Sequence, residues 1–301
     1  MKYMEGLDIK IKSPELADME NWINGNAQKI NGLRGKLILL HFWNSTSAKS
    51  IRSVKFVKKI YAKYGKKNLV IIGIHEPEFD FAKDPKNIKY MIKKLGITYP
   101  IALDNDNKSA ENFDNEYIPS MYLIDENGYV ISTYFDDFTR SKIEIAIQKK
   151  LKSKIALEKQ EKMEYMLDQS QDIYAGFAKN VMLGSGLRYD KKGCSAYVDS
   201  GYRIRDTLYP EGEWEQEKEY LELRKASGSI VYAFYAREAN VVIEPLEKNV
   251  KMEIQIDDKK SKTVYVKDAE MYNVFKSKKY EEKEIKLIFN GNVRVYAFTF
   301  G

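Results

Sequence analysis

Cysteine is almost absent from this chain of 301 residues, which contains only Cys194. A single thiol cannot form a disulfide within the chain, so no internal disulfide holds the fold together. The sequence places no evident base or cationic group beside Cys194, and we interpret it as a structural residue rather than a nucleophile.

Long apolar runs are missing as well. The longest, residues 37–40 and 69–72, are strand-sized, far below the roughly 20 residues that a membrane-spanning helix needs. The first six residues lack the apolar stretch of a signal peptide. Two interpretations stay open: the protein is cytoplasmic, or a segment for export or membrane anchoring is missing from this chain.

Blocks of one charge sign are absent too. The 50 basic and 44 acidic residues are interspersed and give a net charge of +6. A nucleic-acid groove needs basic residues gathered on one face with aromatic residues between them, so we expect no nucleic-acid partner. The spacing of histidine, cysteine and carboxylate residues predicts no metal site, and we expect no cofactor. Glu76 and Glu78 are interpreted as solvated loop acids, with a role as weak ligands as the alternative.

Strand-like and helix-like patterns alternate in the first half of the chain. The predicted strands are 37–43, 69–75, 100–103, 120–124 and 130–134, and the predicted helices are 47–64, 84–96 and 141–165. A βαβα order followed by ββα is typical of a mixed α/β sheet with an antiparallel edge.

After residue 169 the pattern changes to short alternating strands, which favours a β-sandwich or jelly roll. The predicted strands are 229–236, 241–244, 251–256, 263–266, 284–289 and 294–300. We therefore predict an α/β domain at 1–150, a helical linker at 151–169 and an all-β sandwich at 170–301.

The first predicted helix begins beside Ser47 and Ser50, directly after a buried strand. The carboxyl end of a central strand is where function concentrates in α/β sheets. A helix N-terminus acidifies a thiol, and a second thiol three residues later lies close enough to close a disulfide. Here serine occupies both positions. Phe42-Trp43 before this segment and Ile51-Arg52 after it resemble the thioredoxin family, and in particular its TlpA and DipZ branch.

Other segments share this resemblance. They are residues 33–36, 73–79, 95–106 and 118–125. The resemblance implies a thioredoxin-like fold, and it identifies Ser47 and Ser50 with the catalytic cysteines of a Cys-x-x-Cys motif. Pro119 matches the family's cis-proline, beside which the backbone at Ile118 and Pro119 pairs with a substrate peptide.

The same resemblance suggests further site residues and partners. His41 occupies the strand position where many thioredoxins carry a buried proton-shuttling acid; a packed core histidine is the equal alternative. Trp43 is expected to line the peptide groove, with a core position as the alternative, and His75 to lie in a loop at its rim. The implied partners are protein thiols or disulfides and a membrane redox partner, in an extracytoplasmic setting.

The ends of the second domain, residues 172–177 and 296–301, look like the start and end of the DipZ C-terminal module. That module is a β-sandwich similar to carbohydrate-binding modules, which implies carbohydrate as a partner. Exposed aromatic rings would stack on sugars, whereas most rings in a sandwich fill its core. The aromatic residues concerned include Tyr202, Tyr209, Trp214, Tyr220, Tyr232 and Tyr235.

Serine cannot perform disulfide exchange, because an alkoxide is not accessible near neutral pH and two hydroxyls form no equivalent bond. Either both cysteines were deliberately exchanged for serine, or this is a natural member without redox activity. A serine hydrolase is excluded, since neither Ser47 nor Ser50 lies in a Gly-x-Ser-x-Gly elbow. Three functions stay open: a thiol-disulfide oxidoreductase without its cysteines, a peptide binder, and a carbohydrate-docking protein.

Overall fold

A computed structural model describes residues 11–135, 140–158, 168–180, 183–184, 193–198 and 201–301. The chain forms two units, Met1–Glu164 and Tyr165–Gly301, each with its own core. In the described residues no helix combines the length and the apolar character that a bilayer crossing demands.

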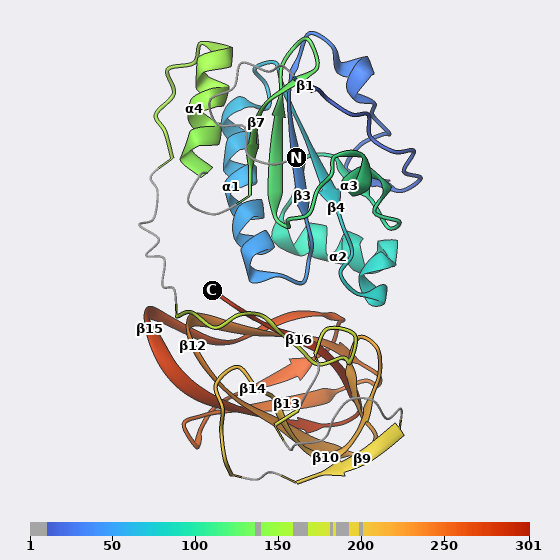
Figure 1. Cartoon of the computed structure of the whole chain (residues 1–301), viewed down its shortest axis with the longest axis vertical. Helices are drawn as coiled ribbons and strands as arrows, with labels where there is room; N and C mark the ends of the chain where they lie inside the picture. Colours follow the sequence, from blue (N-terminus) through green and yellow to red (C-terminus); the bar gives the residue numbers. More distant parts are fainter. Residues whose placement is uncertain (1–10, 136–139, 159–167, 181–182, 185–192, 199–200) are drawn as a thin grey trace. The chain divides into compact units, whose positions relative to one another are not determined.

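The N-terminal unit is built on a seven-stranded sheet with the order β1-β7-β6-β3-β4-β5-β2 (Figure 1). Its strands are β1 (Ile11–Lys12), β2 (Trp22–Ile23), β3 (Leu37–Trp43), β4 (Leu69–His75), β5 (Ile101–Leu103), β6 (Ser120–Ile124) and β7 (Tyr129–Tyr134). The three strands β3, β4 and β5 run parallel to one another, β6 pairs antiparallel with β3, and β7 pairs antiparallel with β6. The predicted mixed sheet is therefore confirmed, whereas β1 and β2 were not predicted.

Helices cover both faces of this sheet. They are η1 (Ile30–Leu33), α1 (Ala48–Tyr64), η2 (Asp80–Lys83), α2 (Pro85–Leu95), α3 (Lys108–Asn112) and α4 (Arg140–Leu151). Apolar side chains of α1, α2 and α4 share one core with Leu37 and Leu39 of β3. Ile38 and Leu40 point to the opposite core, beneath α3. Because β3 is buried on both faces, its sequence is a continuous apolar run.

Three residues determine where α2 begins and ends. The Asp84 side chain accepts a hydrogen bond from the Lys86 N–H at 2.8 Å, and Pro85 occupies the first helical position. Gly96 ends the helix with φ +61, a left-handed conformation that glycine adopts without steric cost.

The predicted helix at 141–165 is wrong for residues 152–158, which are not helical. Lys152 adopts φ +48, which ends the helix. The following residues instead satisfy their backbone through side chains of α4: Glu144 accepts from the Glu158 N–H, and Gln148 donates to the Ile155 carbonyl. The rest of the predicted linker, at 159–167, lies outside the described residues.

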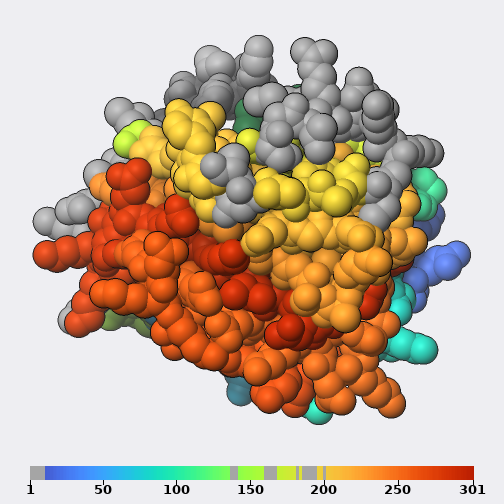
Figure 2. Space-filling view, turned by 90° about the horizontal axis from the view of Figure 1, so that it is seen from below, coloured from blue at the N-terminus to red at the C-terminus, as the bar shows by residue number. Residues whose placement is uncertain are grey.

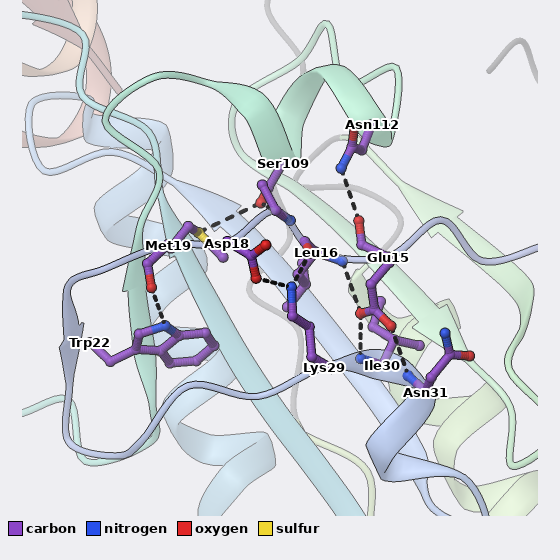
Figure 3. A network of polar contacts seen from close by, with 11 residues as sticks. Glu15, Leu16, Asp18, Met19, Trp22, Lys29, Ile30, Asn31, Ser109 and Asn112 are labelled. Carbon is purple, nitrogen blue, oxygen red and sulfur yellow. Dashed lines mark hydrogen bonds and ion pairs between the residues drawn. The ribbon is translucent and has the colours of Figure 1, made fainter.

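Glu15 fixes the N-terminal arm, residues 11–29 before η1, to the rest of the N-terminal unit (Figure 3). Its carboxylate accepts hydrogen bonds from the N–H groups of Ile30 and Asn31, at the start of η1. The Glu15 carbonyl accepts from the Asn112 amide of α3 at 3.0 Å. A carboxylate placed at unpaired helix N–H groups is favourable, so these contacts hold the arm beside η1 and α3.

The C-terminal unit is strand-rich, with the sheet order β14-β13-β15-β12-β10-β11-β16-β8 and β9 paired to β10. Its strands are β8 (Ile173–Tyr174), β9 (Gly193–Tyr197), β10 (Tyr209–Gln216), β11 (Leu221–Leu223), β12 (Ser227–Pro245), β13 (Val250–Ile256), β14 (Lys259–Val266), β15 (Glu270–Asn290) and β16 (Val293–Phe300). Figure 2 shows the surface that its yellow, orange and red segments present.

Two long strands differ from the prediction. The predicted strands 229–236 and 241–244 are one strand, β12, with register shifts near residues 236–240. The predicted strand 284–289 is only the end of β15. The register shifts between β12 and β15 break the alternation of apolar and polar residues. The sequence pattern therefore predicted shorter strands than the structure has.

Candidate active site

Ser47 lies at the junction between β3 and α1. It is the residue before the helix, with extended backbone angles (φ −112, ψ 131), and its carbonyl accepts from the Ile51 N–H at 3.0 Å. Its side chain makes no capping hydrogen bond to α1. The hydroxyl therefore stands at the positive end of the helix dipole without serving as the cap.

Ser50 is fully buried in the first turn of α1. Its Oγ accepts a hydrogen bond from the Asn44 N–H at 3.2 Å. Residues three apart on a helix share a face, so Ser47 and Ser50 follow each other along one side of the first turn. This is the arrangement in which two thiols could form a disulfide.

His41 contacts the same turn through Ser53, which the sequence reasoning missed. The His41 Nε2 lies 2.7 Å from the Ser53 Oγ, and that hydroxyl donates to the Ser50 carbonyl at 2.8 Å. A hydroxyl has one hydrogen, so Ser53 accepts from His41 and Nε2 carries a proton. The available signal was the three-residue spacing from Ser50 to Ser53.

Trp43 and His75 are core residues. Both side chains are fully buried, and their rings meet edge to face with centroids 5.1 Å apart. Burial lowers the pKa of His75 to about 3, so its ring is neutral near pH 7. His75 is the last residue of β4 rather than part of a rim loop, and Trp43 packs in the core instead of forming an exposed groove wall.

The Ile118–Pro119 peptide bond is cis and leads directly into β6. Ser120, the first residue of β6, pairs with Phe42 near the end of β3. Pro119 is buried and Ile118 is half-buried. The fold thus brings Ile118 and Pro119 to the end of the sheet where β3 meets α1 at Ser47, although these residues are distant in sequence.

Asn115 ties the segment before Pro119 to two strands. Its Oδ1 accepts from the Ser120 Oγ at 2.6 Å and from the Tyr122 Oη at 3.0 Å. Its Nδ2 donates to the Glu76 Oε1 at 2.9 Å. One amide therefore joins the ends of β4 and β6 to the loop that carries the cis bond.

Glu76 is the second residue whose role the sequence reasoning missed. It was interpreted as a solvated loop acid, but its side chain is buried. Burial above all, helped by the nearby Asp104 charge and opposed by the Asn115 hydrogen bond, raises the pKa of Glu76 to about 8. Burial also raises the pKa of Asp104, against hydrogen bonds from the N–H groups of Ser109 and Ala110. Glu76 directly follows the apolar strand β4, which was the signal available in the sequence.

The described part of the chain holds no group of three or more histidine, cysteine, aspartate or glutamate side chains that could bind a metal ion. Cys194 lies in β9 and pairs with Glu215 of β10. The structure describes the backbone of Cys194 but not its side chain.

Two family models match the chain, one for each unit. Residues 21–147 match the redoxin family, and residues 170–301 match a family described as a thioredoxin-like C-terminal domain. The thiol-disulfide oxidoreductase YkuV of Bacillus subtilis is 30% identical over 122 residues, which are 40% of this chain and 82% of YkuV. The chain belongs to the thioredoxin-like thiol-disulfide oxidoreductase family.

Other members of the family cover different shares of the chain. The protein DipZ of Mycobacterium tuberculosis is 38% identical over 121 residues, which are 39% of this chain. The chain spans only 17% of the length of DipZ in that match. Among solved structures, a thiol-disulfide isomerase from Corynebacterium glutamicum is 23% identical, with a TM-score of 0.42 over 47% of this chain and 97% of its own.

Proposed function

We propose that the N-terminal unit is the scaffold of a DipZ- or TlpA-type thiol-disulfide oxidoreductase in which Ser47 and Ser50 occupy the positions of the two redox cysteines. The observation that carries this proposal is the position of both serines in the first turn of α1, at the carboxyl end of β3. The neighbouring cis bond at Pro119 supports it.

As it stands, the chain is expected to exchange no disulfides at these positions. Exchange begins when a thiolate attacks a disulfide sulfur and releases the other sulfur as a thiolate. A helix N-terminus lowers a thiol pKa into the neutral range. It cannot do the same for the far less acidic hydroxyls of Ser47 and Ser50. Both origins of the serines, deliberate exchange and natural loss, are compatible with this chemistry.

The proposed substrates are protein thiols or disulfides presented in an extended segment beside Ile118 and Pro119. His41 would act as a positioning residue, because its contact through Ser53 reaches the carbonyl of Ser50. A membrane redox partner belongs to the same proposal. It rests on the resemblance to DipZ alone.

The test is the S47C/S50C variant, made in a C194S background so that only the restored thiols can react. We expect this variant to reduce the disulfides of insulin with a dithiol as electron donor, while the C194S chain shows no turnover above buffer. S47C and S50C alone serve as controls, since a single thiol cannot close the cycle. A folded S47C/S50C variant without turnover would contradict the oxidoreductase scaffold and favour peptide binding.

A second candidate function is carbohydrate binding by the C-terminal unit, with a jelly-roll architecture like that of carbohydrate-binding modules. A cluster on β11, β12 and β16 favours it. The Arg294 guanidinium lies 4.7 Å from the Tyr220 ring centroid and bonds Glu222 at 2.9 Å and Glu244 at 3.3 Å. Half-buried rings beside carboxylates and a guanidinium are suited to sugar rings and hydroxyls. By contrast, Tyr209, Trp214 and Tyr232 are core residues.

A glycan-binding screen of the full chain tests this candidate. Binding that is lost in Y220A but retained in Y265A would support it, because Tyr265 is an exposed tyrosine elsewhere in the unit. Equal binding by both variants would remove the cluster from consideration.

A further inference from the structure

The positive charge of this chain is concentrated in one segment. Residues 48–103 contain 13 basic and 4 acidic residues, while the rest of the chain contains 37 basic and 40 acidic residues. This segment alone therefore carries a net charge of +9, against −3 for the remainder. The expectation of evenly interspersed charge does not hold for this part of the chain.

The fold turns this segment into one surface. Helices α1 and α2 contain no acidic residue. Their apolar sides, including Val57 and Ile92, pack into the same core against one face of the sheet, so their polar sides face away from that core. The Lys58 ammonium of α1 bonds the Leu95 carbonyl at the end of α2, which shows that the two helices meet there.

Exposed lysines line the outer sides of both helices. We call Lys55, Lys59, Lys86, Lys89, Lys93 and Lys94 the lysine face; all six are exposed. Lys55 and Lys59 are four residues apart, and Lys86, Lys89 and Lys93 recur at spacings of three and four, which places them on one side of each helix; Lys94 directly follows Lys93.

Few carboxylates lie close enough to neutralise the positive charge of the lysine face. Within the described residues, Lys59 pairs with Glu158 at 3.1 Å, whereas Lys55, Lys86, Lys89 and Lys93 have no carboxylate within 4.0 Å. Like charges four residues apart on a helix are destabilising, as for Lys55 with Lys59 and Lys89 with Lys93. An anionic partner would relieve this repulsion.

The composition of the surface distinguishes between anionic partners. Nine of the ten basic residues on the two helices are lysine and one, Arg52, is arginine. Nucleic-acid sites favour the bidentate arginine fork and several stacking aromatic rings. A lysine ammonium is a point charge on a flexible stem, which suits phosphates that have no fixed arrangement. Tyr90, 40% exposed among these lysines, has the amphipathic ring that is enriched at membrane interfaces.

We propose that the lysine face of α1 and α2 binds the surface of a membrane rich in anionic lipids. The interaction is electrostatic and peripheral, through lipid phosphates, and it does not depend on Ser47 or Ser50. Lysines near such a surface contribute about fivefold each to the partition coefficient at low salt, and salt weakens this contribution.

The experiment measures co-sedimentation of the full chain with vesicles of phosphatidylcholine alone or with one third phosphatidylglycerol. We expect binding to the anionic vesicles only, reduced by salt at about 0.3 M. The variant K55Q/K86Q/K89Q/K93Q should bind at least about tenfold more weakly. Exposed lysine substitutions of this kind rarely disturb folding, and a circular-dichroism melt checks this point.

The matched control is K248Q/K259Q/K278Q/K279Q, which removes the same charge from exposed lysines of the C-terminal unit. It should retain anionic-vesicle binding within about twofold. The proposal is overturned if the chain does not bind the anionic vesicles, or if the control weakens binding as much as the lysine-face variant. Tighter binding to a duplex DNA oligonucleotide than to vesicles, lost in the lysine-face variant, would overturn it in favour of a nucleic-acid surface.

Discussion

Replacing Glu76 with glutamine should remove a pH dependence from the stability of the N-terminal unit. Burial, with the nearby charge of Asp104, raises the Glu76 pKa from 4.5 to about 8. Between these values the folded chain holds a proton that the unfolded chain releases, so stability falls as pH rises. The stabilising contribution is complete below pH 4.5 and is lost as the pH rises through about 8.

The size of the effect follows from the gap between the two pKa values. Each pH unit corresponds to about 1.4 kcal/mol, so the gap amounts to about 5 kcal/mol as an upper value. Glutamine cannot ionise, and its side-chain oxygen can still accept the Asn115 N–H. E76Q should therefore match the parent chain within about 1 kcal/mol at pH 5 and exceed it by several kcal/mol at pH 9.

The assay is urea unfolding at pH 5 and pH 9, with the N-terminal unit followed by pulsed hydrogen exchange of a peptide that covers β3. E111Q is the matched control, because Glu111 is exposed on α3 and its substitution removes the same charge. If E76Q and the parent chain lose the same stability between the two pH values, Glu76 is not the group that titrates.

Three further substitutions should destabilise the N-terminal unit in urea. N115A leaves Glu76 and two hydroxyls without their shared partner and should cost about 2–3 kcal/mol; a cost below about 0.5 kcal/mol would mean that water replaces the amide. E144A leaves Lys63 and Tyr64 without the buried carboxylate at 3.0 and 2.9 Å and should cost about 3 kcal/mol; it should cost much less when Lys63 is already alanine. G73A places a Cβ 2.3 Å from the Ile101 Cδ1 and should cost about 1–3 kcal/mol; an unchanged midpoint would show that Ile101 moves aside freely.

The sequence patterns predicted the elements that carry the site. The apolar runs at 37–43 and 69–75 correspond to β3 and β4, because both strands are buried on two faces and need no polar alternation. The start of α2 at Asp84-Pro85 and its end at Gly96 could also be predicted, because helix caps depend on residues that are close in sequence. Strands of two residues, such as β1 and β2, are too short to show any period.

The rest of the site depends on contacts between distant residues. The burial of Glu76 comes from its position beside Asn115 and Asp104, which lie 39 and 28 residues further along the chain. The pattern at 69–75 already includes His75 in the strand, and only the resemblance placed it in a rim loop; its burial depends on packing against Trp43. The core position of Trp43 likewise follows from packing against His75.

The most direct test of the proposed scaffold is whether cysteines at positions 47 and 50 form a reversible disulfide. The C194S/S47C/S50C variant would be equilibrated in glutathione redox buffers and its state measured by alkylation and mass spectrometry. The account predicts a single intramolecular disulfide between the two cysteines that opens and closes with buffer potential, while C194S alone shows no thiol at all. A restored pair that stays reduced in every buffer, or oxidises only between chains, would contradict the claim that α1 begins at a redox site.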